Sequence, residues 1–172
     1  LQGDWSSDVC SSDLNAGSFR FEPRTGKFDL YTAVGYANPH GHVFDLYGTD
    51  ILHDGTGSNP YDAALISGRI DYPNKHRPAP QVYGQRTRPC PATEFVSGGQ
   101  FPDELAGELL VENVIGDLGI LRYRIEEQGS SITGAEQPPL LLSSDPNFRP
   151  VDLEFAPDGT LYLVDWQNPI IG

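Results

Sequence analysis

Two histidines stand two residues apart in the stretch "NPHGHVFD", where His40 and His42 follow Asn38 and Pro39. Residues spaced by two point to the same side of a β-strand, so both imidazoles are expected on one face. An imidazole that titrates near neutral pH can take the proton of a hydroxyl group as a general base. A histidine here can equally be a hydrogen-bonded structural residue, so the sequence leaves both interpretations open.

A second group of polar residues lies in "HDGTGSNPYD", where Asp54, Asn59 and Asp62 are separated by glycines and other turn residues. Carboxylate and amide oxygens on a glycine-rich turn are ligands that suit calcium. The spacing is not that of an EF-hand loop. Ordinary turns in which Asp and Asn accept backbone hydrogen bonds would explain the same residues.

Three segments of similar pattern must position these groups: "VFDLYGTDILHD" (43–54), "PDELAGELLVEN" (102–113) and "EFAPDGTLYLVD" (154–165). Each has a turn glycine, then a short apolar run, then Asp or Asn. Glycine at the turn and β-branched or aromatic residues after it are typical of β-hairpins. Repeats of this length favour the blades of a β-propeller, so we predict an all-β fold with little helix. The terminal residues Asn113 and Asp165, with Trp166, would then fall on one rim.

The same segments carry a family resemblance. "NPHGHVFDLYGTD" resembles the "RNPxGLAFDPxG" signature of soluble quinoprotein glucose and sorbosone dehydrogenases. "FPDELAGELLVENVIGDLGILRYRIEE" and "FRPVDLEFAPDGTLYLVDWQN" resemble two further blades of that family. Residues 17–172 as a whole are similar to large membrane-bound dehydrogenases of planctomycete-type bacteria. The resemblance implies about three blades of a propeller that is six-bladed in a longer parent protein.

The resemblance also implies an activity and its cofactors. A sugar or other alcohol would be oxidised with pyrroloquinoline quinone and calcium, and the electrons would pass to a cytochrome c domain, which carries haem c elsewhere in the parent chain. A periplasmic or cell-envelope location follows from the same comparison. Ala37 stands where the relatives have an arginine that holds the anionic quinone, which removes one expected anchor. The implied catalytic residues are His40 and His42, the implied quinone-binding residues are Asn38, Arg149, Asp152 and Asp165, and the implied calcium ligands are Asp54, Asn59 and Asp62.

Two other functions remain as alternatives. A non-catalytic propeller that binds carbohydrate or protein would explain the loss of the arginine at Ala37 and the shift of Arg149 from its usual place. A calcium-dependent propeller hydrolase is a third hypothesis, although no motif argues for it specifically.

Composition limits the partners and the domain boundaries. A reverse translation of "DWSSDVCSSDL" (4–14) resembles a common sequencing-library adapter, so residues 1–14 are expected to be an artefact and residues 15–172 a propeller domain cut at both ends. The formal net charge of −13 disfavours binding to nucleic acid or to anionic membranes. No apolar run is long enough for a membrane-spanning helix. Cys90, the cysteine outside the adapter-like segment, is expected to be a small buried residue.

Overall fold

The computed structural model describes residues 17–32, 38–56, 58–63, 80–84, 86 and 88–170. Within these ranges the chain is built from β-strands, joined by one short 3₁₀ turn, η1 (Asp103–Leu105), which confirms the all-β prediction. None of the described residues forms a helix able to cross a bilayer. The strands are β1 (Ser18–Glu22), β2 (Lys27–Thr32), β3 (Pro39–Phe44), β4 (Asp50–Asp54), β5 (Asn59–Asp62), β6 (Thr93–Phe95), β7 (Leu109–Asn113), β8 (Gly119–Gln128), β9 (Ser131–Leu142), β10 (Pro150–Phe155) and β11 (Leu161–Asp165).

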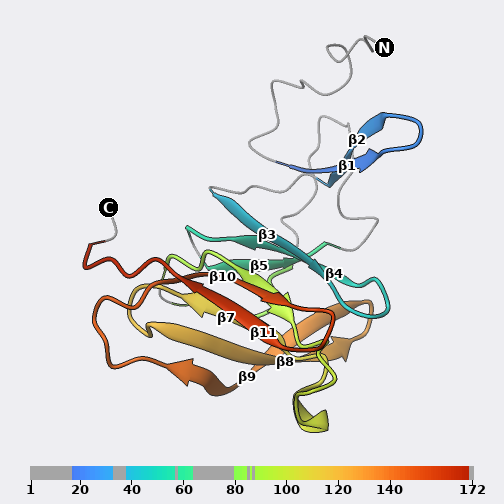
Figure 1. Ribbon diagram of the computed structural model, residues 1–172. Helices are drawn as coiled ribbons and strands as arrows, with labels where there is room; N and C mark the ends of the chain where they lie inside the picture. Colours follow the sequence, from blue (N-terminus) through green and yellow to red (C-terminus); the bar gives the residue numbers. More distant parts are fainter. Residues whose placement is uncertain are drawn as a thin grey trace.

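The strands form four small antiparallel sheets, with the orders β1-β2, β3-β4-β5, β6-β7-β8-β9 and β10-β11 (Figure 1). Residues 80–82 extend the second sheet, because Gln81 bridges Tyr61 and Val82 donates its N–H to the carbonyl of Pro60. The two central sheets are thus alike, with neighbouring strands that follow one another along the chain.

The three glycine-turn segments fold as equivalent hairpins: β3–β4, β6–β7 and β10–β11. Their turn glycines Gly48, Gly107 and Gly159 have φ angles of 85°, 76° and 84°, a region that favours glycine. In the first and third hairpins the N–H of this glycine donates a hydrogen bond to the carbonyl of the residue three positions earlier, which closes the turn. The second hairpin has the longer connection 97–106 at this place, which contains η1. The predicted repeat is therefore real at the level of backbone hydrogen bonds.

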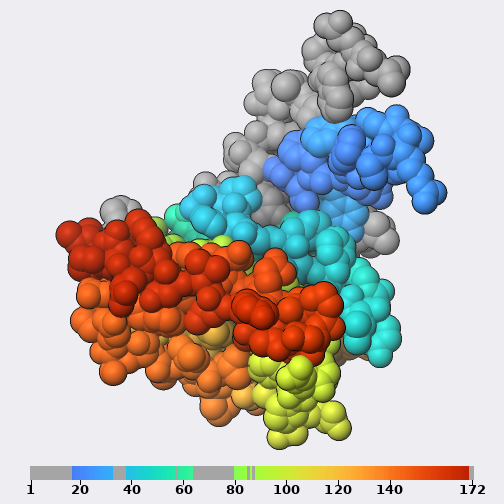
Figure 2. All heavy atoms as spheres, viewed as in Figure 1, coloured from blue at the N-terminus to red at the C-terminus, as the bar shows by residue number. Residues whose placement is uncertain are grey.

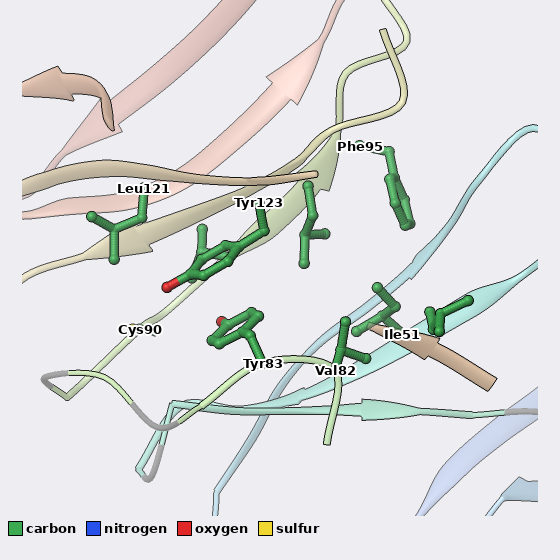
Figure 3. Packing of buried hydrophobic residues seen from close by; sticks show 10 residues of the cluster. Ile51, Val82, Tyr83, Cys90, Phe95, Leu121 and Tyr123 are labelled. Atoms are coloured by element: carbon green, nitrogen blue, oxygen red, sulfur yellow. The ribbon is translucent and has the colours of Figure 1, made fainter. Parts of the chain in front are cut away.

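Neighbouring sheets pack face to face, so the core is divided into layers. One cluster joins the second and third sheets, and Figure 3 shows Tyr83 and Tyr123 facing each other across it, with ring centroids 3.8 Å apart. A second cluster joins the third and fourth sheets, where Leu110 and Ile120 meet Leu153. Burying apolar side chains between two sheets is the main stabilising term for such short strands. The β1–β2 hairpin extends from this stack (Figure 1).

Candidate functional site

The strand ends of the first and third hairpins carry the same hydrogen-bond arrangement. Asp54 Oδ1 accepts the backbone N–H groups of Asn38 and Thr56, each at 3.0 Å. Asp165 Oδ1 accepts those of Arg149 and Gln167, each at 2.8 Å. In both hairpins a carboxylate oxygen ties the end of the second strand to the beginning of the first. This geometry is that of the turn-capping interpretation.

The residue that begins each hairpin also accepts a backbone bond from beyond the strand end. Gly55 donates its N–H to the carbonyl of Asn38 at 2.9 Å, and Trp166 donates to that of Arg149 at 2.9 Å. Asn38 and Arg149, both predicted to bind the quinone, therefore occupy equivalent positions in the first and third hairpins. Asn38 is exposed, whereas Arg149 is 8% exposed.

Arg149 is a buried cation with few partners. Its Nη1 donates to the carbonyl of Phe148 at 2.8 Å, while its Nε has no hydrogen-bond partner. No carboxylate within the described part of the chain forms an ion pair with it. A buried guanidinium without a counter-charge is costly, so this group is suited to an anion.

Asp152, the fourth predicted quinone-binding residue, lies next to a bulge in β10, where the pairing with β11 shifts between Pro150 and Asp152. Its side chain is exposed. Its charge contributes to raising the pKa values of Glu112 in β7 and Glu94 in β6.

The predicted calcium ligands do not come together as one set. Asp54 and Asn59 are paired across β4 and β5, but Asp62 lies at the far end of β5, opposite Ile51, about 10 Å along the strand. Asn59 accepts a bond from Gln81, and Asp62 accepts one from Ser131 at 2.8 Å. Among the described residues, no group of three His, Cys, Asp or Glu side chains could hold a metal ion. The donors present here therefore do not fit calcium.

His40 and His42 do not share a face, which corrects the prediction from their spacing. The pairing of β3 with β4 shifts between Pro39 and Gly41, so a β-bulge at His40 breaks the alternation of side chains. The His40 ring lies over Gly55, where a Cβ atom would come within 2.4 Å of it, and His40 acts electrostatically on buried His53. His40 itself is exposed at the strand end.

His42 points to the other side of the sheet, toward the β1–β2 hairpin. Its Nδ1 lies 2.7 Å from Ser18 Oγ, and its Nε2 lies 2.7 Å from Asp50 Oδ2. The ring centroid is 5.5 Å from that of Tyr31 and 4.6 Å from that of Phe44. His42 is therefore held between two sheets, and it cannot act on the same substrate atom as His40.

The strand ends of the first and second hairpins are directly connected. Cys90 donates its N–H to the carbonyl of Gly55 at 3.2 Å, and its thiol bonds Ser58 Oγ at 3.1 Å. Asn113, at the end of β7, donates from its side chain to Cys90 Sγ at 3.5 Å. Burial raises the pKa of the Cys90 thiol, which is consistent with the predicted buried, unreactive residue.

A shallow groove of about 530 Å³ lies at the opposite ends of the second and third hairpins. None of the predicted site residues lines it. It is formed by the 97–100 segment and the β10–β11 turn, with Ser97, Gly98, Gly99, Gln100, Phe155, Ala156, Pro157, Asp158 and Gly159 as lining residues.

Several polar residues with unusual surroundings were not predicted from the sequence. Ser18, Tyr31 and Asp50 surround His42 but are far from it in sequence or on another strand. Glu112 is fully buried with both carboxyl oxygens unpartnered, and burial raises its pKa to about 8. A signal for Glu112 was present, since a charged residue within the apolar run "LLVEN" is unusual. Ala37 and the adapter-like residues 1–14 lie outside the described residues.

Comparison with known proteins identifies one family. Residues 67–172, more than half of the chain, match the family described as "Domain of unknown function (DUF7133)". The chain belongs to this family. The DUF7133 match covers the third and fourth sheets, and so includes the second and third hairpins, whereas β1 to β5 precede it. No curated protein and no solved structure matches the chain.

Proposed function

We propose that this DUF7133 chain is part of a β-propeller dehydrogenase of the quinoprotein type, which oxidises a sugar or other alcohol. The observation that carries the proposal is buried Arg149, whose guanidinium lacks a counter-charge among the described residues. Pyrroloquinoline quinone bears carboxylates, and a guanidinium binds carboxylates through paired hydrogen bonds. Arg149 also lies at a hairpin start, beside a strand end, as Asn38 does.

The propeller part of the proposal is supported by comparing equivalent faces of the three hairpins. Ile51 and His53 in the first hairpin, and Leu110 and Glu112 in the second, are all 0% exposed beneath the following sheet. Their counterparts in the third hairpin, Tyr162 and Val164, are 60% and 53% exposed. Figure 2 shows the β10–β11 hairpin at the surface of the molecule. Since two copies of this face are covered by a further copy of the same unit, we propose that the third is covered likewise in a closed ring.

In this proposal His40 is the general base, because it is exposed at the hairpin start, while both ring nitrogens of His42 are already hydrogen-bonded, to Ser18 and Asp50. His40 would take the proton of the substrate hydroxyl, and Arg149 would bind and orient the anionic cofactor. The quinone, when bound, supplies the hydride acceptor. No step is assigned to calcium, because Asp54, Asn59 and Asp62 do not form a site. The cytochrome c partner domain and the periplasmic or cell-envelope location remain part of the same proposal.

The experiment has a binding arm and a turnover arm. Trp166 donates its backbone N–H to Arg149, so its fluorescence in a Trp5→Phe background should be quenched when pyrroloquinoline quinone is added. Arg149→Gln should abolish the quenching, and His40→Gln should leave it. In the longer parent protein that this proposal implies, dye reduction with a panel of sugars and alcohols should require both Arg149 and His40. If neither this chain nor that parent protein binds the quinone, the proposal fails.

A non-catalytic propeller that binds carbohydrate or protein is the second candidate. The observation in its favour is that the carboxylates of Asp54 and Asp165 serve as backbone caps, which leaves fewer groups for cofactor chemistry. Glycan-array binding that persists in the His40→Gln variant, without dye reduction on any substrate, would select this function.

A further inference from the structure

A hydrogen-bonded chain of Ser18, His42 and Asp50 crosses from the first sheet to the second. Ser18 Oγ is 2.7 Å from His42 Nδ1, and His42 Nε2 is 2.7 Å from Asp50 Oδ2. The residues come from β1, β3 and β4, so the chain exists only when the two sheets are packed together. A serine bonded to an imidazole that is oriented by a carboxylate is the arrangement of an activated nucleophile.

The neighbours of Asp50 define the direction of these bonds. Asp50 is 3% exposed, and its carboxylate also accepts a hydrogen bond from the Tyr31 hydroxyl. Burial, followed by the charge of Asp50 and this hydrogen bond, raises the pKa of the Tyr31 phenol. A carboxylate only accepts hydrogen bonds, so His42 Nε2 donates to it. In the neutral tautomer that carries its proton on Nε2, Nδ1 is the acceptor, and the Ser18 hydroxyl donates to it. This is the proton arrangement that a serine nucleophile requires.

The imidazole is also held in place and partly accessible. The rings of Tyr31 and Phe44 both contact it at tilted angles, with centroid distances of 5.5 and 4.6 Å. The His42 side chain is 22% exposed, and Ser18 is of intermediate burial. Packing fixes the ring orientation, while its remaining exposure leaves a route for a small reagent.

We propose that Ser18 is an activated nucleophile that reacts with carboxylic esters, with His42 as its base and Asp50 as the residue that positions the imidazole. As Ser18 Oγ attacks the ester carbonyl, its proton moves to His42 Nδ1. The bond to the leaving alkoxide then breaks, and the alkoxide takes that proton from His42. Water, activated by His42, hydrolyses the acyl-serine and restores the hydroxyl. The inference does not depend on the proposed dehydrogenase function, because it uses neither His40 nor Arg149.

The test is covalent labelling of the full chain with a fluorophosphonate probe. In this reaction a bond forms between Ser18 Oγ and phosphorus, fluoride leaves, and His42 takes the serine proton. Peptide mass spectrometry should find the adduct on Ser18. Ser18→Ala should abolish it, and His42→Gln or Asp50→Asn should slow labelling by about 100-fold or more, the usual effect of removing a general base.

Ser131 is the matched control, because its hydroxyl donates a hydrogen bond to a carboxylate, Asp62 Oδ2, at 2.8 Å, whereas that of Ser18 bonds an imidazole. No adduct on Ser18, or equal labelling of Ser18 and Ser131, overturns the proposal.

A second measurement keeps His42 and Asp50 unchanged, so it applies even where substitutions at those residues prevent folding. In a Cys10→Ser background, Ser18→Cys would place a thiol beside the His42 base, while Cys90 is buried. Alkylation by iodoacetamide at pH 7 should be at least about 10-fold faster for Ser18→Cys than for Ser131→Cys, because the imidazole promotes the thiolate. Equal rates would contradict an activating role of His42.

Discussion

The two interfaces on either side of the third sheet differ at one equivalent position. In the interface between the second and third sheets this position is His53, and in the next interface it is Glu112; both are 0% exposed. His53 Nε2 lies 3.3 Å from the Tyr83 hydroxyl, whereas neither oxygen of Glu112 has a hydrogen-bond partner. One repeat position thus holds a base in one layer and an acid in the next.

Burial shifts the pKa values of these two residues in opposite directions. Desolvation lowers the pKa of His53 to about 4, and it raises that of Glu112 to about 8, with a further contribution from Asp152. In each case burial disfavours the charged form. The comparison shows that the stacked hairpins accept different polar groups provided that these groups are neutral. It also predicts opposite pH dependences for the two interfaces.

The largest effect is expected for Glu112→Gln. The pKa of Glu112 is about 8 in the folded protein and about 4.5 when the side chain is exposed. The free energy of unfolding therefore falls as pH rises from about 4.5 to about 8, because ionisation favours the unfolded chain. The loss is on the order of 5 kcal/mol. Glu112→Gln should remove this slope and be more stable than the wild type at pH 9. Urea unfolding at pH 5 and pH 9 measures it, and parallel pH profiles for the two proteins would count against a buried neutral carboxyl group.

His53→Gln should change the opposite limb of the profile. With a folded pKa of about 4 against 6.5, His53 contributes stability that is complete above pH 6.5 and is lost as pH falls toward 4. The loss is on the order of 3 kcal/mol, and it should disappear in His53→Gln when unfolding is followed at pH 4 and pH 7. Tyr83→Phe removes the hydroxyl neighbour but keeps the imidazole, so it should retain the slope. Retention of the slope in His53→Gln would assign it to another group.

Gly41→Ala tests how closely the first of these interfaces is packed. A Cβ at Gly41 would lie 2.8 Å from Thr93 Oγ1 and 3.4 Å from His53 Cβ. Overpacking should cost about 2 kcal/mol in the free energy of unfolding. The equivalent position in the next hairpin is Ala92, which the second interface accommodates. In a double-mutant cycle, Thr93→Ala should relieve most of the cost, and additive effects would show that the two side chains are not in contact.

The smallest effect is expected at Glu108, a buried carboxylate that, unlike Glu112, has cationic partners. Arg122 Nε is 2.8 Å from it and 17% exposed, while Arg124 Nη2 is 3.3 Å away and 53% exposed. Arg124→Ala should therefore cost less than about 0.5 kcal/mol, because exposed ion pairs are weak. Arg122→Ala should cost more free energy of unfolding, and thermal unfolding of both variants measures the difference. A larger loss for Arg124→Ala would reverse the assignment of the main partner.

The repeat could be predicted from the sequence because its signals are local. The turn glycines Gly48, Gly107 and Gly159 all adopt positive φ, and Asp54 and Asp165 both end strands. The hydrogen bonds of Asp54 and Asp165 to the backbone could not be predicted from local signals, because they depend on how the strand ends meet. The hairpins could therefore be predicted from local sequence signals, whereas the hydrogen bonds at their ends could not.

The features that escaped prediction depend on irregular or long-range geometry. A single bulge at His40 places His40 and His42 on different faces, although their spacing suggested one. The bond between Ser18 and His42 joins two sheets across 24 residues of sequence. Periodicity describes strands one at a time, so it gives no information on which face of one sheet meets which face of the next.

The three hairpins stack with their strand ends on the same side of the molecule. Thr56, Ile115 and Gln167 each follow a strand-end residue by two positions, and Asp158 lies in the opposite turn of the third hairpin. Electron–electron distance measurements between spin labels at Thr56 and Gln167, compared with labels at Thr56 and Asp158, test this arrangement. The Thr56–Gln167 distance should be clearly shorter, since a five-residue strand separates the two ends of a hairpin by about 17 Å. A Thr56–Asp158 distance equal to or shorter than the Thr56–Gln167 distance would contradict it.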